Sequence, residues 1–363
     1  MNKKKKLYIH GSFMNDNYGD FLLYYVVDRI CKYYDKDLDY FSADIDKTYD
    51  NYCKINRKSK IYGIIKSDLV VFAGGGYFGE PDKRKLYWNL RCLVKHLIPA
   101  YIISKRKIPY VIIGVETGPL SLKINKILLK TICNNAKTLS VRNEESKKFL
   151  EKIGIKNNIL VNPDWIMGVN GKDLLKQSQR AEEILEKINK ENKKIFVHLT
   201  TRNSQGMENV INDLETFMEN RKNIYYIIGC DQKREIQEER AIELSKKFPK
   251  DKCKVLFYEG PWILSSILNK VDAVITDKLH VGIVATKFKK EVISVASHNK
   301  SVKFYGLIGR SNWTNHLNNI KPKETLKKLE KLTFKNIEIN EEIFIKAKNN
   351  EEILKGFLED NIK

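Results

Sequence analysis

The chain has 363 residues, enough for two domains of ordinary size, and 42% of them are hydrophobic, which excludes an intrinsically disordered protein. Its 66 Lys and Arg residues against 45 Asp and Glu residues give a formal net charge of +21. Lysine is scattered through the predicted helices and turns, often beside Glu, so no nucleic-acid module stands out and no specific nucleic-acid partner is expected. No apolar run approaches the roughly 20 residues that a membrane-spanning helix needs.

The six cysteines form no CxxC pair and have no zinc-like spacing to a histidine. We therefore expect reduced thiols and no metal site. The basic start of the chain is followed by too short an apolar stretch for a signal peptide, so a cytoplasmic protein is expected. The positive charge adds the expectation of a weak, peripheral association with the inner face of the membrane.

Short apolar strands alternate with amphipathic helices along the first half. Strands are predicted at residues 7–9, 40–43, 69–73, 109–115, 138–141 and 159–161, and helices at 21–33, 87–105, 122–136 and from 142–146 to 153. Residues 46–60 give no clear prediction. The pattern lapses over residues 165–173, where we place a linker between domains.

The second half repeats the alternation. Strands are predicted at residues 195–199, 224–229, 255–257, 273–276 and 291–295, and helices at 209–218, 237–247, 261–269 and 281–287. A charged, helical tail is predicted from residue 321 onward. The sequence thus predicts an α/β protein with two doubly wound Rossmann-like domains facing a cleft, over residues 1–168 and 169–320, and a C-terminal helical segment over residues 321–363.

Charged side chains follow two predicted strands of the second half. Asp277, Lys278 and His280 come after the strand at 273–276, and Lys300 and Lys303 come after the strand at 291–295. Open α/β sheets bind ligands at the carboxyl ends of their strands, and cationic groups there would hold an anionic substrate. The alternative is that a single histidine such as His280 is a structural residue.

The first half offers weaker candidates at its own strand ends. Gly74, Gly75 and Gly76 would let a ligand approach closely, or would simply form a turn that needs positive φ. Asn17 could bind sugar hydroxyls, and Asp20 is either a catalytic base or a helix N-cap. Arg142 suits a carboxylate or phosphate, or else belongs to a network at the start of a helix.

In order along the chain, these motifs resemble the polysaccharide pyruvyl transferase family. The similarity rests on Asn17-Tyr-Gly-Asp20, the strand from Asp68 to Gly76, the strand and Gly-Pro turn from Ile112 to Pro119, the helix start from Arg142 to Ser146, Asn162-Pro-Asp164, Lys278-Leu-His280 and Lys300. Lys278 stands where the family pattern has Arg. Glu116 precedes the Gly-Pro turn.

The resemblance implies a GT-B-like fold and transfer of a pyruvyl group from phosphoenolpyruvate, with no other cofactor, to two hydroxyls of a sugar as a ketal. It implies a lipid- or nucleotide-linked acceptor, bound on the N-terminal side with the donor on the C-terminal side, and a role in cell-surface polysaccharide synthesis. It makes His280 the general acid, with Arg142 and Lys300 holding the carboxylate and phosphate of the donor.

Two other functions remain open at this point. A GT-B glycosyltransferase using a nucleotide sugar would have the same two-domain fold and glycine-rich loop. A polyanion- or membrane-surface binder without catalytic activity would explain the charge of +21.

Overall fold

The computed structural model describes residues 3–362 except residues 44, 82, 83, 187, 189–191 and 203. Its contacts divide the chain into two compact units, which are described separately. The first unit contains residues 1–16, 20–169 and 341–363, and the second contains residues 17–19 and 170–340. The last helix of the chain thus returns to the first unit, and a three-residue segment near the N-terminus belongs to the second.

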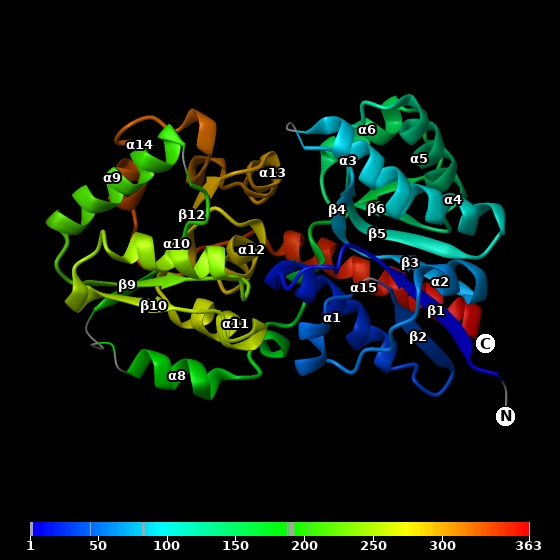
Figure 1. Ribbon diagram of the computed structural model, residues 1–363, viewed down its shortest axis with the longest axis horizontal. Helices are drawn as coiled ribbons and strands as arrows, with labels where there is room; N and C mark the ends of the chain where they lie inside the picture. Colours follow the sequence, from blue (N-terminus) through cyan, green and yellow to red (C-terminus); the bar gives the residue numbers. More distant parts are fainter. Residues whose placement is uncertain are drawn as a thin grey trace. The chain divides into compact units, whose positions relative to one another are not determined.

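The first unit is built on a parallel sheet (Figure 1). Its described strands are β1 (Lys5–His10), β2 (Leu38–Ser42), β3 (Leu69–Phe72), β4 (Gly75–Phe78), β5 (Tyr110–Thr117), β6 (Leu139–Val141) and β7 (Ile159–Val161). They are ordered β2-β1-β3-β5-β6-β7, and β4 also pairs with β5. The continuous apolar runs form strands covered on both faces, as expected for a parallel sheet.

Helices of the first unit complete the core. They are α1 (Tyr18–Lys32), α2 (Lys60–Lys66), α3 (Lys85–Cys92), the π-helical segment η2 (Leu93–Leu97), α4 (Ile98–Lys105), α5 (Lys123–Asn135), α6 (Glu144–Lys152), α7 (Trp165–Gly168) and α15 (Glu341–Ile362), with a short 3-10 turn η1 (Lys47–Asn51). The inward faces of α4 and α5 supply Ile103, Leu129 and Ile132, which cluster with Phe72 and Ile112 of the sheet.

The second unit has its own parallel sheet, ordered β10-β9-β8-β11-β12-β13 in the part of the chain that the structure describes. The strands are β8 (Lys193–His198), β9 (Ile224–Gly229), β10 (Cys253–Leu256), β11 (Ala273–Thr276), β12 (Glu291–Ala296) and β13 (Thr314–His316). The α-helices are α8 (Ser178–Glu186), α9 (Gln205–Asn220), α10 (Glu235–Ser245), α11 (Pro261–Lys270), α12 (Leu279–Lys287), α13 (Asn299–Leu307) and α14 (Glu324–Leu329), and the 3-10 turns are η3 (Gly171–Leu174), η4 (Lys250–Lys252), η5 (Ser311–Trp313) and η6 (Leu317–Asn319).

The predicted α/β class with two Rossmann-like sheets is confirmed. The sequence did not predict α2, the glycine-rich strand β4, the short helix α7, the polar edge strand β13 or α13. The predicted linker at residues 165–173 holds α7 and η3. The tail is not helical throughout, because an irregular stretch separates α14 from α15. All six cysteines are free thiols, five of them buried.

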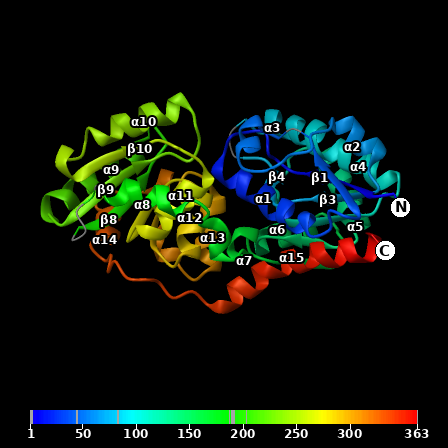
Figure 2. The ribbon, with the colours of Figure 1, turned by 90° about the horizontal axis from the view of Figure 1, so that it is seen from below.

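A buried asparagine attaches α15 to the first sheet. The helix packs against α7 (Figure 2) and against β5. Asn350 is fully buried and donates from Nδ2 to the carbonyl oxygen of Pro163 at 2.9 Å. Its Oδ1 accepts from Ser140 Oγ at 2.8 Å and from Asn162 Nδ2 at 3.3 Å. The C-terminal helix therefore satisfies polar groups that follow or lie within β6 and β7.

We expect Asn350→Ala to lower the free energy of unfolding by about 2–4 kcal/mol, because it leaves buried donors and acceptors without partners. Asn349, its exposed neighbour on the same helix, is the matched control, and Asn349→Ala should change stability by less than about 0.5 kcal/mol. Urea unfolding of the two variants measures this difference. Equal stabilities would contradict the assigned role of Asn350.

Candidate functional site

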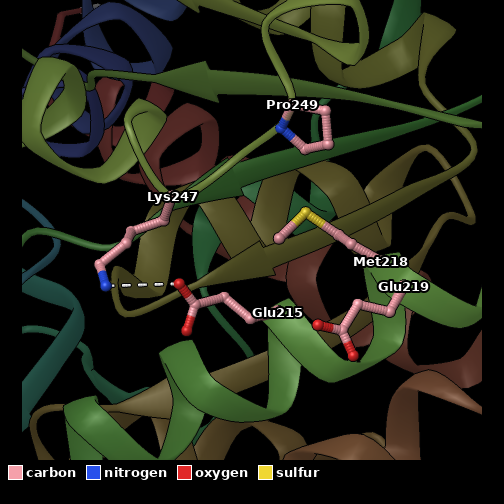
Figure 3. A pocket seen from close by; sticks show the side chains of 5 residues that line it. All are labelled: Glu215, Met218, Glu219, Lys247 and Pro249. Carbon is pink, nitrogen blue, oxygen red and sulfur yellow. Dashed lines mark ion pairs between the residues drawn. The ribbon is translucent and has the colours of Figure 1, made fainter.

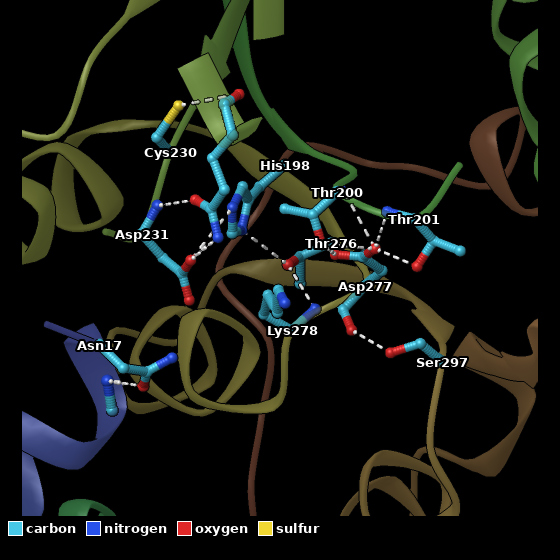
Figure 4. Close-up of polar contacts among 12 residues, drawn as sticks. Asn17, His198, Thr200, Thr201, Cys230, Asp231, Thr276, Asp277, Lys278 and Ser297 are labelled. Atoms are coloured by element: carbon cyan, nitrogen blue, oxygen red, sulfur yellow. Dashed lines mark hydrogen bonds and ion pairs between the residues drawn. The ribbon is translucent and has the colours of Figure 1, made fainter. Parts of the chain in front are cut away.

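The strand order of the second unit places its site. From β8 the chain moves outward to β9 and β10, then returns to the other side of β8 with β11. Ligands of open α/β sheets bind beside such a reversal, at the carboxyl ends of the strands. At this position His198 ends β8 and Thr276 ends β11, and Thr200, Thr201 and Asp277 follow directly (Figure 4).

Asp277 joins the two strand ends. Its buried carboxylate accepts hydrogen bonds from the backbone nitrogens of Thr200 and Thr201 at 2.9 and 2.8 Å. The hydroxyls of the same two threonines also donate to it, at 2.7 Å from Thr201 and 3.1 Å from Thr200. Its backbone is held as well, because Asp277 N donates to His198 O at 3.1 Å and Ser297 Oγ donates to Asp277 O at 3.2 Å. Asp277 therefore fixes the turn that carries Lys278 and His280.

His198 is a buried residue at this site that the sequence did not single out, because it lies inside the strand predicted at residues 195–199. Its Nε2 lies 3.6 Å from Asp231 Oδ1, and its Nδ1 lies 3.5 Å from Thr276 Oγ1. That hydroxyl oxygen accepts from Lys278 N at 3.0 Å. Burial lowers the pKa of His198, against the opposing effect of the Asp231 and Asp277 carboxylates. The neutral imidazole of His198 thus contacts Thr276, whose hydroxyl in turn holds the backbone nitrogen of Lys278.

His280 lies against the segment of residues 17–19, which belongs to the second unit. A Cβ added to Gly19 would stand 1.7 Å from His280 Nδ1, so only glycine leaves room for the imidazole ring. Tyr18 attaches the segment to the rest of the second unit: its backbone nitrogen donates to Asp231 O at 3.0 Å, and its hydroxyl shares a hydrogen bond of 2.7 Å with that of Ser265. Within the segment, Asn17 Oδ1 accepts from Gly19 N at 3.0 Å. The structure therefore places Gly19, two residues after Asn17, against the predicted residue His280.

Positive charge gathers at the ends of β11 and β12. Burial lowers the pKa of His298, and the positive charges of Lys300 and Lys278 lower it further. Lys278 and His298 stand at the N-cap positions of α12 and α13, so two helix N-termini begin here. Helix N-termini and cations both favour an anion. Lys303 lies three residues beyond Lys300 on α13.

Arg142 lies in the first unit and is already paired. Its guanidinium forms ion pairs with Glu116 and, at 3.5 Å, with Asp164. Burial alone would lower the pKa of Arg142, but the two carboxylates outweigh that effect and raise it. The three residues come from the ends of β5, β6 and β7, so the strand-end position predicted for Arg142 is correct. An anion that bound Arg142 would have to share its guanidinium with the carboxylates of Glu116 and Asp164.

Backbone conformation explains one of the three predicted glycines, Gly75. Gly75 has φ +139°, a conformation that favours glycine, and Gly75 and Gly76 begin β4. A Cβ on Gly76 would lie 3.5 Å from Arg142 Nη2 and 3.6 Å from Glu116 Oε2, so this strand passes beside the ion pair. Asp20 lies in the first turn of α1, which starts at Tyr18, so the alternative of Asp20 as N-cap is wrong. Ligand binding by the glycines and catalysis by Asp20 stay predictions.

A pair of buried histidines at the end of β1 was not predicted. His10 Nε2 lies 3.0 Å from His96 Nδ1, and His10 Nδ1 lies 3.1 Å from the Tyr8 hydroxyl. The Tyr77 ring stacks on His96, with 4.7 Å between ring centroids. Burial lowers the pKa of His10 to about 3. Burial is also the largest cause that lowers the pKa of His96, and the neighbouring His10 lowers it further. Both rings are therefore neutral in the folded protein.

A surface pocket of the second unit lies elsewhere. It is lined by Glu215, Met218 and Glu219 of α9 and by Lys247 and Pro249 after α10 (Figure 3). These residues lie at the C-terminal ends of their helices, and therefore at the amino ends of the strands. Lys247 Nζ and Glu215 Oε1 form an ion pair of 3.3 Å across it. Among the described side chains, no group of three or more His, Cys, Asp or Glu is placed to hold a metal ion.

Two comparisons with known sequences were made. The family model described as polysaccharide pyruvyl transferase matches residues 17–299. No protein with a curated description matches the sequence.

Solved structures share the fold at low sequence identity. UDP-GlcNAc 2-epimerase from Methanocaldococcus jannaschii has a TM-score of 0.66 and 16% identity, over 98% of this chain and 99% of that one. The Neisseria meningitidis UDP-GlcNAc 2-epimerase bound to UDP-GlcNAc has a TM-score of 0.61 and 12% identity, over 98% of this chain and 100% of that one. A glycosyltransferase from Rickettsia africae has a TM-score of 0.57 and 13% identity, over 100% of this chain and 95% of that one.

The hydrogen bonds of the Asp277 carboxylate predict that its substitution destabilises the fold. Asp277→Asn keeps the shape of the side chain but turns an amide group toward backbone N–H donors, so we expect a loss of about 2–4 kcal/mol in the free energy of unfolding. Asp251→Asn, at an exposed position, is the control. Chemical denaturation measures both. Equal midpoints for Asp277→Asn and the native protein would show that the carboxylate does not hold the turn.

The histidine pair predicts a pH dependence of stability. The folded-state pKa of His10 is about 3 and its ordinary value is 6.5, so the unfolded chain takes up the proton first as the pH falls. Stability should therefore fall between pH 6.5 and pH 3, by up to about 1.4 kcal/mol per pH unit for each histidine. Unfolding at pH 7 and pH 5 should show a smaller difference for His10→Gln than for the native protein. His316→Gln is the control, and equal pH slopes in all three proteins would contradict the account.

Proposed function

We propose that this chain, which belongs to the polysaccharide pyruvyl transferase family, transfers the pyruvyl group of phosphoenolpyruvate to two hydroxyls of a sugar. The observation that carries the proposal is the turn from Lys278 to His280. It is fixed by Asp277, adjoins Gly19, and lies among cations and helix N-termini that suit an anionic donor. The matched region extends from Asn17 to Asn299 and so includes both Gly19 and this turn.

In the proposed reaction His280 is the general acid. It gives a proton to the terminal methylene carbon of phosphoenolpyruvate, and positive charge develops at the carbon that carries the phosphate. One sugar hydroxyl attacks that carbon and loses its proton, and the carbon–oxygen bond to phosphate breaks. The second hydroxyl then attacks the same carbon and loses its proton, which closes the ketal. Of the two protons that the hydroxyls release, one returns to His280 and the other leaves with the phosphate. One molecule of phosphate is released for each ketal formed.

Lys278 and Lys300 are assigned to the carboxylate and phosphate of the donor. They lie close enough to His298 for both charges to lower its pKa, and the N-termini of α12 and α13 add a favourable potential. Lys303 is assigned to the same anion-binding group. Lysine at position 278 keeps the charge but lacks the bidentate geometry of arginine. Arg142 of the first unit carries two carboxylate partners, and its assignment to the carboxylate or phosphate of the donor rests on the family resemblance.

The wider setting is also proposed. The acceptor is a sugar carried on a nucleotide or a lipid, and the product enters cell-surface polysaccharide synthesis from the cytoplasmic side. The family assignment supports a glycan acceptor. The structural neighbours with UDP-GlcNAc in their names support a sugar nucleotide as one form of it.

We expect the native protein to release phosphate from phosphoenolpyruvate when it is given a panel of nucleotide- and lipid-linked sugars. His280→Ala should lower kcat by about 100-fold or more, because a general acid contributes roughly that factor. Gly19→Ala should also lower kcat, since the added methyl group displaces the His280 ring. Lys278→Gln should mainly raise KM for the donor. Lys246→Gln, at an exposed position of the second unit, is the control.

Two outcomes would contradict the proposal. The first is phosphate release that His280→Ala leaves unchanged. The second is thermal stabilisation by UDP or GDP without any by phosphoenolpyruvate, which would favour glycosyl transfer from a nucleotide sugar.

A further inference from the structure

Exposed apolar side chains gather on one group of helices in the first unit. Among the described residues, eleven of the seventeen exposed large apolar side chains lie on α2, α3, η2, α4 and α5. They are Ile61, Ile65, Leu86, Tyr87, Trp88, Leu90, Val94, Ile98, Ile102, Ile124 and Ile127. Large contiguous apolar patches on soluble proteins usually bind something.

Five of these residues follow one another at intervals of four. Leu86, Leu90, Val94, Ile98 and Ile102 are 63%, 48%, 63%, 41% and 38% exposed. A four-residue interval drifts slowly around an ordinary α-helix, which has 3.6 residues per turn. The π-helical segment η2 lies in the middle of the series, and its wider turn reduces that drift. The five side chains therefore form a continuous apolar ridge along α3, η2 and α4.

Neighbouring helices widen the ridge. α4 packs against both α2 and α5 (Figure 1). Ile61 and Ile65 are four residues apart on α2, and Ile124 and Ile127 are three residues apart on α5, so each pair lies on one side of its helix. We call this set of eleven residues the apolar face.

The helices that carry the apolar face contain no acidic residue, although the chain has 45 Asp and Glu residues. They contain nine basic residues: Lys60, Lys66, Lys85, Arg91, Lys95, Lys105, Lys123, Lys126 and Lys130. The Arg91 guanidinium lies 5.3 Å from the Trp88 ring centroid, and Lys105 Nζ lies 5.4 Å from that of Tyr101. Basic, aromatic and aliphatic side chains are thus interleaved along the same helices.

We propose that the apolar face docks on an anionic phospholipid surface. Apolar side chains enter the boundary between headgroups and acyl chains, while lysine and arginine contact the headgroups. Within the described residues, no helix has the length and apolar character to cross a bilayer, so docking would be interfacial. A second copy of the chain fits the face less well, because a two-fold contact would bring nine basic residues against nine more. This inference is independent of the proposed reaction.

Sedimentation with lipid vesicles tests the proposal on the full chain. We expect binding to vesicles of phosphatidylcholine with 30% phosphatidylglycerol, and much weaker binding to pure phosphatidylcholine. Leu86→Ser/Val94→Ser/Ile98→Ser should weaken the binding about tenfold or more. The matched control is Ile236→Ser/Ile242→Ser/Ile345→Ser, which changes three exposed isoleucines outside the apolar face and should bind like the native protein.

A charge variant separates the contribution of the basic residues to vesicle binding from that of the apolar side chains. Lys85→Gln/Lys105→Gln/Lys123→Gln should weaken binding to the anionic vesicles about a hundredfold, since each basic residue near the surface contributes about a fivefold factor. Lys246→Gln/Lys250→Gln/Lys327→Gln is its control, at exposed positions of the second unit. Circular dichroism and melting temperature confirm that each variant is folded.

Three results would overturn the proposal. One is a native protein that does not sediment with anionic vesicles. Another is equal loss of binding in the face variants and their controls. The third is a native dimer, seen by light scattering, that becomes monomeric in the serine variant, which would assign the apolar face to contacts between copies of the chain.

Discussion

The buried carboxylate of Asp277 is the constraint on which the candidate site depends. A buried charge is costly unless it is fully hydrogen-bonded, and Asp277 meets that condition by binding two consecutive residues that follow β8. Those bonds join the carboxyl ends of β8 and β11, where the strand order reverses. Any movement of the turn after β11 would leave the charge unsatisfied. Lys278 and His280 are thus held in place before a substrate arrives, which is the condition for positioning and electrostatic catalysis.

Cationic residues have different surroundings in the two units. In the first unit, Arg142 is buried between Glu116 and Asp164, and the three hold the ends of adjacent strands together. In the second unit, Lys278 and Lys300 act together on His298 and lower its pKa. A neutralised arginine suits a structural role, and a concentrated positive potential suits the binding of an anion. The lysines whose charges suit an anionic donor therefore lie in the second unit.

Much of this could be predicted from the sequence. Consecutive apolar residues indicated the buried strands, and the rule that ligands bind at strand ends selected Lys278, His280, Lys300 and Arg142. Other features depend on contacts distant in sequence. His198 reads as an ordinary strand residue until Asp231 and Thr276 are placed beside it. The reason for glycine at position 19 appears only when His280 lies against it.

Local sequence patterns also predicted the wrong secondary structure for some segments. β13 is short and polar, so it lacks an apolar pattern. The glycines at residues 74–76 suggested a turn or a ligand-binding loop, whereas backbone pairing with β5 makes Gly75 and Gly76 the start of a strand. The return of α15 to the first unit follows from the buried bonds of Asn350, which no local pattern reveals. In each case tertiary pairing overrode local preference.

The most direct test of the central claim is a crystal structure of the protein with phosphoenolpyruvate or a non-reactive analogue. The account predicts that the carboxylate and phosphate lie beside Lys278 and Lys300, at the N-termini of α12 and α13, with the methylene carbon facing His280. A donor bound elsewhere, with no contact to the Lys278–His280 turn, would contradict it.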